Sequence, residues 1–123
     1  MEFKIPIVIH VDYGGFTLTG RVHELLAERK VPWLKRCAKT ADGRWFLPHK
    51  EDDELRRDPD LVEVVRELEG EFVAAITDIN DWTARNRLEQ QLLHGLKVVN
   101  VTVSIEIEEH DGKETVRVTG GNW

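Results

Sequence analysis

The sequence predicts a single α+β domain over residues 1–123, in which an antiparallel sheet carries about three helices on one face. Two stretches near opposite ends of the chain alternate apolar and polar residues, as half-buried strands do. Between them lie segments whose apolar residues recur at helical spacing. The predicted strands and helices do not alternate as parallel-sheet units would, so an antiparallel sheet with helices gathered on one face fits best.

The strongest signal is a β-hairpin at the carboxyl end. Residues 99–107 alternate apolar with polar side chains, and Asp111-Gly112 tolerates the positive φ angles of a type I′ turn before a second strand at 115–119. If Asp111 and Gly112 are the two loop residues, counting outward sets the register. It predicts these pairs: Ile107 with Val116, Ile105 with Val118, and Glu106 with Arg117.

A second strand is predicted at the amino terminus, where Phe3, Ile5, Ile7, Ile9 and Val11 share one side. Pro6 has no amide hydrogen, so this strand is expected at a sheet edge or with a bulge. We expect the apolar residues spaced two apart near both ends of the chain to line one buried layer, with the helices laid over it.

The first predicted helix spans about residues 19–30. Its apolar residues are spaced for one face, Thr17 or Thr19 can cap its start, and Pro32 follows its end. Asp42-Gly43, ahead of residues 44–47, indicates a second, shorter hairpin, with Trp45 in the core.

Two further helices are predicted after an exposed loop at residues 48–57, which contains almost nothing to bury. Asp58-Pro59 begins a helix that ends at Gly70, and residues 72–76 are expected to form a short strand. Asn80 or Asp81 can cap the last helix, which His94-Gly95 closes.

Composition narrows the classes of function. The formal net charge of −6 opposes nonspecific attraction to nucleic acid and to anionic membranes. No apolar run approaches the roughly 18 residues of a membrane span, and the amino terminus lacks a signal-peptide layout. Cys37 is the only cysteine, so the chain cannot form an internal disulfide and a reducing compartment is expected. The predicted location is the cytoplasm.

Three motifs resemble a family of small bacterial and phage proteins of unknown function. They are Tyr-Gly-Gly-Phe-Thr-Leu-Thr at 13–19, Arg-Asp-Pro-Asp-Leu-Val-Glu-Val-Val at 57–65 and Ile-Glu-Ile-Glu-Glu-His-Asp-Gly-Lys-Glu at 105–114. The chain departs from that pattern at Thr17 and Thr19, where the family usually has serine, and at His110, where it has tyrosine. The resemblance implies a phage or prophage setting and no reaction.

The best ligand-site candidate in the sequence is the turn Tyr13, Gly14, Gly15 and Phe16, with Arg56 or Arg57 nearby. A turn between a strand and a helix amino terminus can present free amide hydrogens to a nucleotide or another phosphorylated ligand. The alternative is that the glycines only permit a tight turn while Phe16 fills the core, because most glycine turns bind no ligand.

Two other groups of polar residues lack the features of a functional site. His49, Asp52, Asp53 and Glu54 offer oxygen ligands without the spacing of a calcium loop, so a solvated cluster is expected. His10 and Asp12 share one side of the first strand, but no nucleophile can be placed beside them. The sequence therefore indicates no catalytic residue, no metal site and no cofactor.

The function predicted from sequence is a noncatalytic protein-interaction or regulatory protein, acting on a protein partner or as a homo-oligomer. Its interface is expected on the exposed side of the terminal hairpin, at Glu106 and Arg117, and at the terminal Trp123. The alternative is a small-molecule or nucleotide binder, possibly an enzyme, with its site at the Tyr13–Phe16 turn. A third option is an acidic mimic of nucleic acid, which requires acidic residues clustered on one face.

Overall fold

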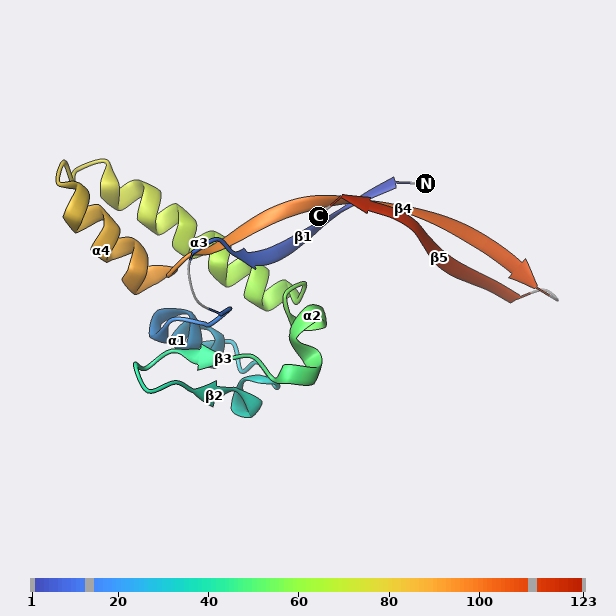
Figure 1. Cartoon of the computed structure of the whole chain (residues 1–123), viewed down its shortest axis with the longest axis horizontal. Helices are drawn as coiled ribbons and strands as arrows, with labels where there is room; N and C mark the ends of the chain where they lie inside the picture. The colour runs from blue at the N-terminus through green and yellow to red at the C-terminus, as the bar shows by residue number, and fades with distance from the viewer. Residues whose placement is uncertain (1, 13–14, 111–112, 123) are drawn as a thin grey trace.

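The computed structural model describes the backbone of residues 2–12, 15–110 and 113–122, and the side chains of residues 2–12 and 15–104. Its main sheet is antiparallel, with strand order β1–β4–β5. The strands are β1 (Glu2–His10), β4 (Leu96–His110) and β5 (Lys113–Asn122). The main helices, α1 (Gly20–Glu28), α3 (Pro59–Ile76) and α4 (Trp82–Leu92), gather on one side of this sheet (Figure 1). The predicted α+β class is confirmed.

The carboxy-terminal hairpin has the predicted register. Ile107 pairs with Val116, Ile105 with Val118 and Glu106 with Arg117, while a register shift follows at Ser104/Ile105. The turn residues Asp111 and Gly112, and the side chains of this part of the hairpin, lie outside the described residues. The alternation of apolar residues and the Asp-Gly pair therefore determined the pairing correctly.

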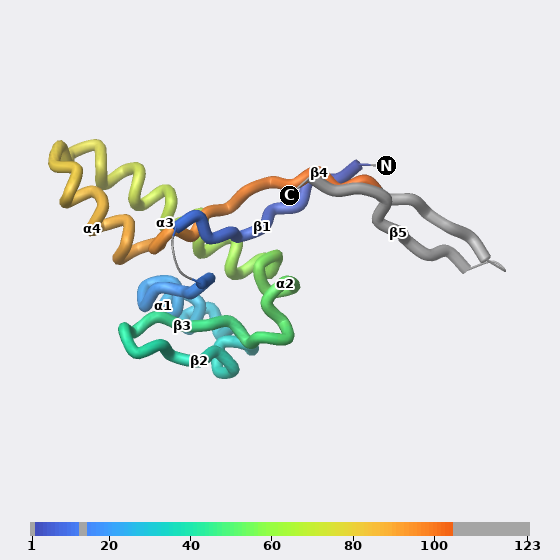
Figure 2. Tube along the Cα trace, in the orientation of Figure 1, coloured from blue at the N-terminus to red at the C-terminus, as the bar shows by residue number. Residues whose placement is uncertain are grey.

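β1 is an edge strand, as Pro6 predicts. It runs antiparallel to β4 from Glu2↔Ser104 to His10↔Leu96 (Figure 2). The Val8 amide points away from β4, because it donates to the Arg56 carbonyl at 2.8 Å. Residues two apart in a strand point their amides the same way, so the nitrogen of Pro6 also faces outward and no bond to β4 is lost.

The side of β1 that enters the core is the opposite of the one expected from its apolar residues. Val8 is fully buried and belongs to the core, together with Leu96 and the partly buried Val98 of β4, whereas the isoleucines of β1 are not part of it. By strand alternation Ile7 and Val99 face away from Val8 and Val98. The apolar rows from the two ends of the chain do share one face, because Ile5 pairs with Val101 and Phe3 with Val103, and both valines are 3% exposed. The expectation that the helices lie over this row is wrong, because they pack on the opposite face of β1, at Val8.

α1 is held at its start by Thr19. The Thr19 hydroxyl accepts a hydrogen bond from the Val22 amide at 3.1 Å and donates one to the Leu92 carbonyl at 2.9 Å. The same side chain thus caps α1 and satisfies a carbonyl at the end of α4. Thr19 is 3% exposed, so these bonds are sheltered from water.

The predicted short hairpin is present as β2 (Ala38–Lys39) paired with β3 (Trp45–Phe46). Gly43 adopts φ +85° in its turn, a conformation that glycine tolerates best. Trp45 is partly buried against the core and bonds through its backbone to Leu18. A 3₁₀ turn, η1 (Leu34–Arg36), connects α1 to this hairpin.

Residues 48–57 are not the predicted open loop. They form a 3₁₀ turn, η2 (His49–Glu51), and a short helix, α2 (Asp52–Leu55). Leu55 is buried at 9% exposure, and Arg56 pairs with Asp52 one helical turn away at 2.6 Å. The buried leucine, this i,i+4 ion pair, the Arg36–Glu51 pair and the bond from the Val8 amide to the Arg56 carbonyl together hold a segment that composition alone predicts to be solvated.

α3 continues through Gly70 to Ile76, so the predicted helix end at Gly70 and the predicted strand at 72–76 are both wrong. Glycine costs a helix interior about 1 kcal/mol relative to alanine, which packing can outweigh. On either side of Gly70, Phe72 packs on the core and the Glu69 carboxylate accepts the Val98 amide of β4 at 2.9 Å. Tertiary contacts therefore override the local signal.

The third predicted helix is confirmed as α4. Asp81 caps it by accepting the Thr83 amide at 3.1 Å, and His94 and Gly95 follow its end with positive φ angles. Within the described part of the chain, no helix combines the length and the apolar content that crossing a lipid bilayer requires.

Replacing Thr19 by valine tests the joint between α1 and α4. Thr19→Val removes the cap and leaves the Leu92 carbonyl without its donor, so we expect the free energy of unfolding to fall by about 1–3 kcal/mol in urea titrations. Thr77→Val is the matched control, because the Thr77 hydroxyl is exposed and bonds only its own helix, at the Val73 carbonyl. Equal losses of stability in the two variants would contradict the conclusion that Thr19 links α1 to α4.

Candidate functional site

One face of the β1–β4 sheet carries apolar side chains that no described helix covers. We call it the bare face; it consists of Phe3, Ile5, Ile7, Ile9, Val99, Val101 and Val103. Val101 and Val103 lie in the central strand and are 3% exposed, the isoleucines are half-buried, and Phe3 is 46% exposed. Lys97 is the only charged residue of β1 and of residues 96–104 on this face. Val11, which follows β1 in the chain, is 63% exposed.

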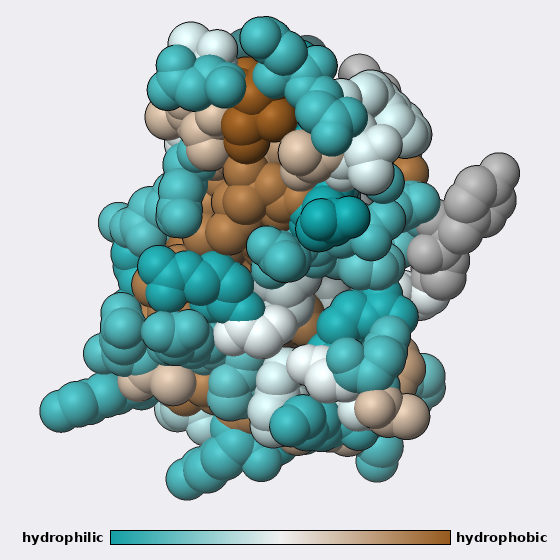
Figure 3. Space-filling view, turned by 90° about the vertical axis from the view of Figure 1, so that its left-hand side faces the viewer, coloured by the Kyte–Doolittle hydropathy of each residue, from teal (hydrophilic) through white to brown (hydrophobic). Residues whose placement is uncertain are grey.

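A second exposed apolar region lies at the far end of the α3–α4 helical pair. Val73 on α3 is 62% exposed and Trp82 at the start of α4 is 75% exposed. Figure 3 views the molecule from this end and shows an apolar strip between polar side chains. Large exposed side chains of this kind are typical of surfaces that contact another protein.

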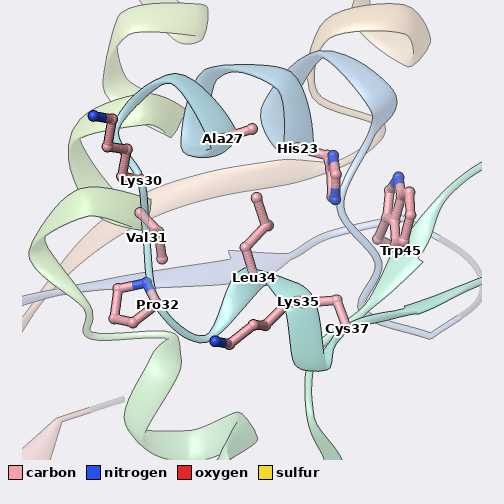
Figure 4. A pocket seen from close by; sticks show the side chains of 9 residues that line it. All are labelled: His23, Ala27, Lys30, Val31, Pro32, Leu34, Lys35, Cys37 and Trp45. Atoms are coloured by element: carbon pink, nitrogen blue, oxygen red, sulfur yellow. The ribbon is translucent and has the colours of Figure 1, made fainter.

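A cleft with a volume of about 590 Å³ lies beside α1. Its apolar floor comes from Ala27 of α1 and from the segment that follows that helix. In Figure 4 the rings of His23 and Trp45 face each other at one end of the cleft, and Val31 and Pro32 lie at the other. We call it the lysine cleft; its lining residues are His23, Ala27, Lys30, Val31, Pro32, Leu34, Lys35, Cys37 and Trp45.

Three lysine side chains lie in or next to the lysine cleft. Lys30 and Lys35 line it, and the Lys39 ammonium lies 5.7 Å from the centre of the Trp45 ring. None of the three lysines forms an ion pair with a carboxylate among residues 2–12 and 15–104, whereas the neighbouring Arg29 and Arg36 do. The cleft is therefore locally cationic on a chain whose net charge is −6.

His23 and Trp45 form a stacked pair, with ring centroids 3.9 Å apart and planes inclined by 13°. Burial lowers the pKa of the His23 imidazole, and the positive charge of Lys39 lowers it further. The ring is thus neutral near pH 7, and its face is available for stacking against an apolar group.

Cys37 is not an activated nucleophile. Burial raises the pKa of its thiol to about 11, against the smaller opposing effect of Arg36. Its Sγ lies 4.0 Å from the Trp33 carbonyl. The thiolate is the reactive form, so this thiol stays protonated and inert near pH 7.

A polar hollow of about 390 Å³ lies at the amino end of α1. Arg44 stands in it between the Asp42 carboxylate, at 2.8 Å, and the His94 ring, at 2.9 and 3.1 Å. His94 in turn stacks on His10, 6.1 Å away. A hydrogen bond from Thr40, and then the contact with Arg44, lower the pKa of Asp42. The Arg44 charge is compensated by Asp42, whereas Arg87, which also lines the hollow, forms no ion pair with the described residues.

The structure brings together part of the ligand site predicted from sequence. The Arg56 guanidinium lies 4.3 Å from the centre of the Phe16 ring, and Phe16 packs against the core. Gly15 and Arg57 are exposed, and Tyr13 and Gly14 lie outside the described residues. The turn does not lead directly into a helix, because α1 begins at Gly20 and Thr19 caps it.

Other polar residues considered in the sequence analysis, or their neighbours, make contacts that stabilise the fold. Asp52 pairs with Arg56, and Glu51 with Arg36. Gly95 must be glycine, because a Cβ there would lie 2.7 Å from the Asp12 Cβ and 3.2 Å from His10. Among the described side chains, no group of three or more His, Cys, Asp and Glu residues could hold a metal ion. The side chains of Glu106, Arg117 and Trp123 lie outside the described set.

Sequence reasoning misses both the lysine cleft and the bare face. A signal for the cleft is present, since residues 29–39 contain five Lys or Arg residues and no acid in an otherwise acidic chain. A signal for the bare face is the row of isoleucines in β1, which is read by default as core. No family model, no curated protein and no solved structure matches the chain.

The lowered pKa of His23 predicts a pH dependence of stability. The unfolded chain binds a proton at His23 near pH 6.5 and the folded chain only at lower pH, so acidification below about 6.5 favours unfolding. His23→Phe keeps an aromatic ring and removes the titration. We expect its melting temperature to fall less between pH 7 and 5 than that of the wild type; parallel curves would contradict this.

Proposed function

We propose that this protein is a noncatalytic protein-interaction module that associates with a second copy of itself through the bare face. The observation that carries the proposal is the orientation of β1, whose wholly apolar side is turned away from the helices. A half-exposed antiparallel sheet ordinarily presents polar residues to water. An apolar second face of this kind is typical of a sheet that another protein layer covers.

Charge favours a second copy as the partner. Two chains of net charge −6 repel each other, and the repulsion is smallest where they meet through an uncharged surface. The bare face is nearly uncharged, with Lys97 alone beside its apolar residues. It is also extended along two strands, so it can pack on its own image around a twofold axis, which is the commonest symmetry of soluble oligomers.

The absence of activated groups in the described residues supports a binding role. Cys37 is held as a thiol, and Arg44 and Asp52 are engaged in ion pairs. His23 is stacked on Trp45 without a carboxylate to orient it. Acid–base and nucleophilic catalysis both need a group whose pKa is tuned toward its task, next to a positioned partner. The phage or prophage setting implied by the resemblance stays a prediction.

Substitutions on the bare face test the proposal. Phe3→Thr combined with Ile7→Thr places a β-branched residue with good strand propensity at each position and removes apolar surface, so the strand should persist while association weakens. We expect sedimentation velocity to show a wild-type dimer and a variant whose dissociation constant is at least about tenfold higher, as the loss of one or two buried side chains implies.

The control is Phe46→Thr, which removes the same side chain at nearly the same exposure, 48% against 46% for Phe3, from the separate β2–β3 hairpin. This variant should dimerise as the wild type does. A wild-type chain that stays monomeric at all accessible concentrations would overturn the proposal. So would equal weakening by the Phe46 and Phe3/Ile7 substitutions.

A further inference from the structure

We propose that the lysine cleft binds an acidic peptide segment, with one apolar side chain of the peptide seated in the cleft and flanking carboxylates on the lysines around it. This site is separate from the bare face. The cleft lies between α1, η1 and β3, on elements that pack on the helical side of the molecule (Figures 1 and 4). The inference does not depend on self-association.

The shape and chemistry of the floor favour an apolar anchor. A volume of about 590 Å³ falls within the range of clefts that hold a small ligand or a few side chains. Ala27, Val31 and Leu34 supply aliphatic contacts, and the stacked rings of His23 and Trp45 close one end. Aromatic and aliphatic side chains fit such a floor, because they lose water contact on both sides.

The charges at the edge favour carboxylates. Lys30, Lys35 and Lys39 have no described ion-pair partner, although the chain carries 23 acidic residues. Nearby acids are instead used by arginines: Glu63 and Glu67 bind Arg29, and Glu51 binds Arg36. Two lysines without a described ion-pair partner, Lys30 and Lys35, therefore line the apolar floor, and a third, Lys39, lies beside Trp45 at its end.

An extended peptide matches both features at once. Successive side chains of a strand point to opposite sides, so residues on either side of an anchor reach outward while the anchor points into the cleft. A sequence that alternates apolar and acidic residues can thus fill the floor and approach the lysines together. A nucleic acid fits less well, because the chain outside the cleft is acidic and repels an extended phosphate backbone.

The test uses the full-length protein and a fluorescein-labelled peptide that alternates leucine and glutamate, with binding followed by fluorescence anisotropy. We expect saturable binding that weakens as salt is added, and a shift of the Trp45 indole N–H signal in NMR spectra. In the variant Lys30→Gln/Lys35→Gln/Lys39→Gln the dissociation constant should rise at least about tenfold, the sum expected of three exposed ion pairs.

Matched controls separate the cleft from overall charge. Lys4→Gln/Lys50→Gln/Arg66→Gln removes the same three charges from exposed positions elsewhere and should leave affinity within about twofold. Peptides with glutamine in place of glutamate, or serine in place of leucine, should bind much more weakly. The proposal is overturned if the peptide does not bind, if both triple variants weaken it equally, or if either altered peptide binds as tightly. Tighter, lysine-dependent binding of a single-stranded oligonucleotide would also overturn it.

Discussion

The strict alternation of side chains in β1 is the constraint on which the rest of the structure depends. Only one side of a strand can enter the core, and here Val8 enters it while the Phe3–Ile9 row does not. The choice is fixed by the pairing of Val8 with Val98 and by the bond from the Val8 amide to Arg56. A shift by one residue would exchange the two faces. Everything that we propose about the bare face follows from this register.

The helical layer supplies most of the buried core, to which the edge strand β1 contributes little. Leu61, Val64, Val65 and Leu68 of α3 are fully buried, and the core that they form receives β1 only at Val8. Thr19 joins α1 to α4, and α1 in turn positions His23 against Trp45. The same packing leaves Lys30, Lys35 and Lys39 around a floor of apolar residues. The two proposed surfaces thus lie on different layers of one domain and can act independently.

Much of the fold was predictable because its signals are local. The hairpin register came from alternation and an Asp-Gly pair, and one of the two cap candidates predicted for each of α1 and α4, Thr19 and Asp81, is the cap observed. The errors arose where a distant contact decides. Gly70 stays helical because neighbouring residues bind the core and β4, and residues 49–55 are ordered around Leu55. Which side of β1 faces inward, and what stacks on Trp45, depend on partners far away in the chain.

Paired substitutions in β1 test the central claim most directly. Val8→Ala removes a fully buried side chain and should lower the free energy of unfolding by about 2 kcal/mol in dilute protein. Ile7→Ala removes a larger side chain from the bare face and should cost less, because in the monomer it opens no cavity in the core. Urea titrations of the two variants decide the matter. A greater loss for Ile7→Ala than for Val8→Ala would place the isoleucines in the core and contradict the account.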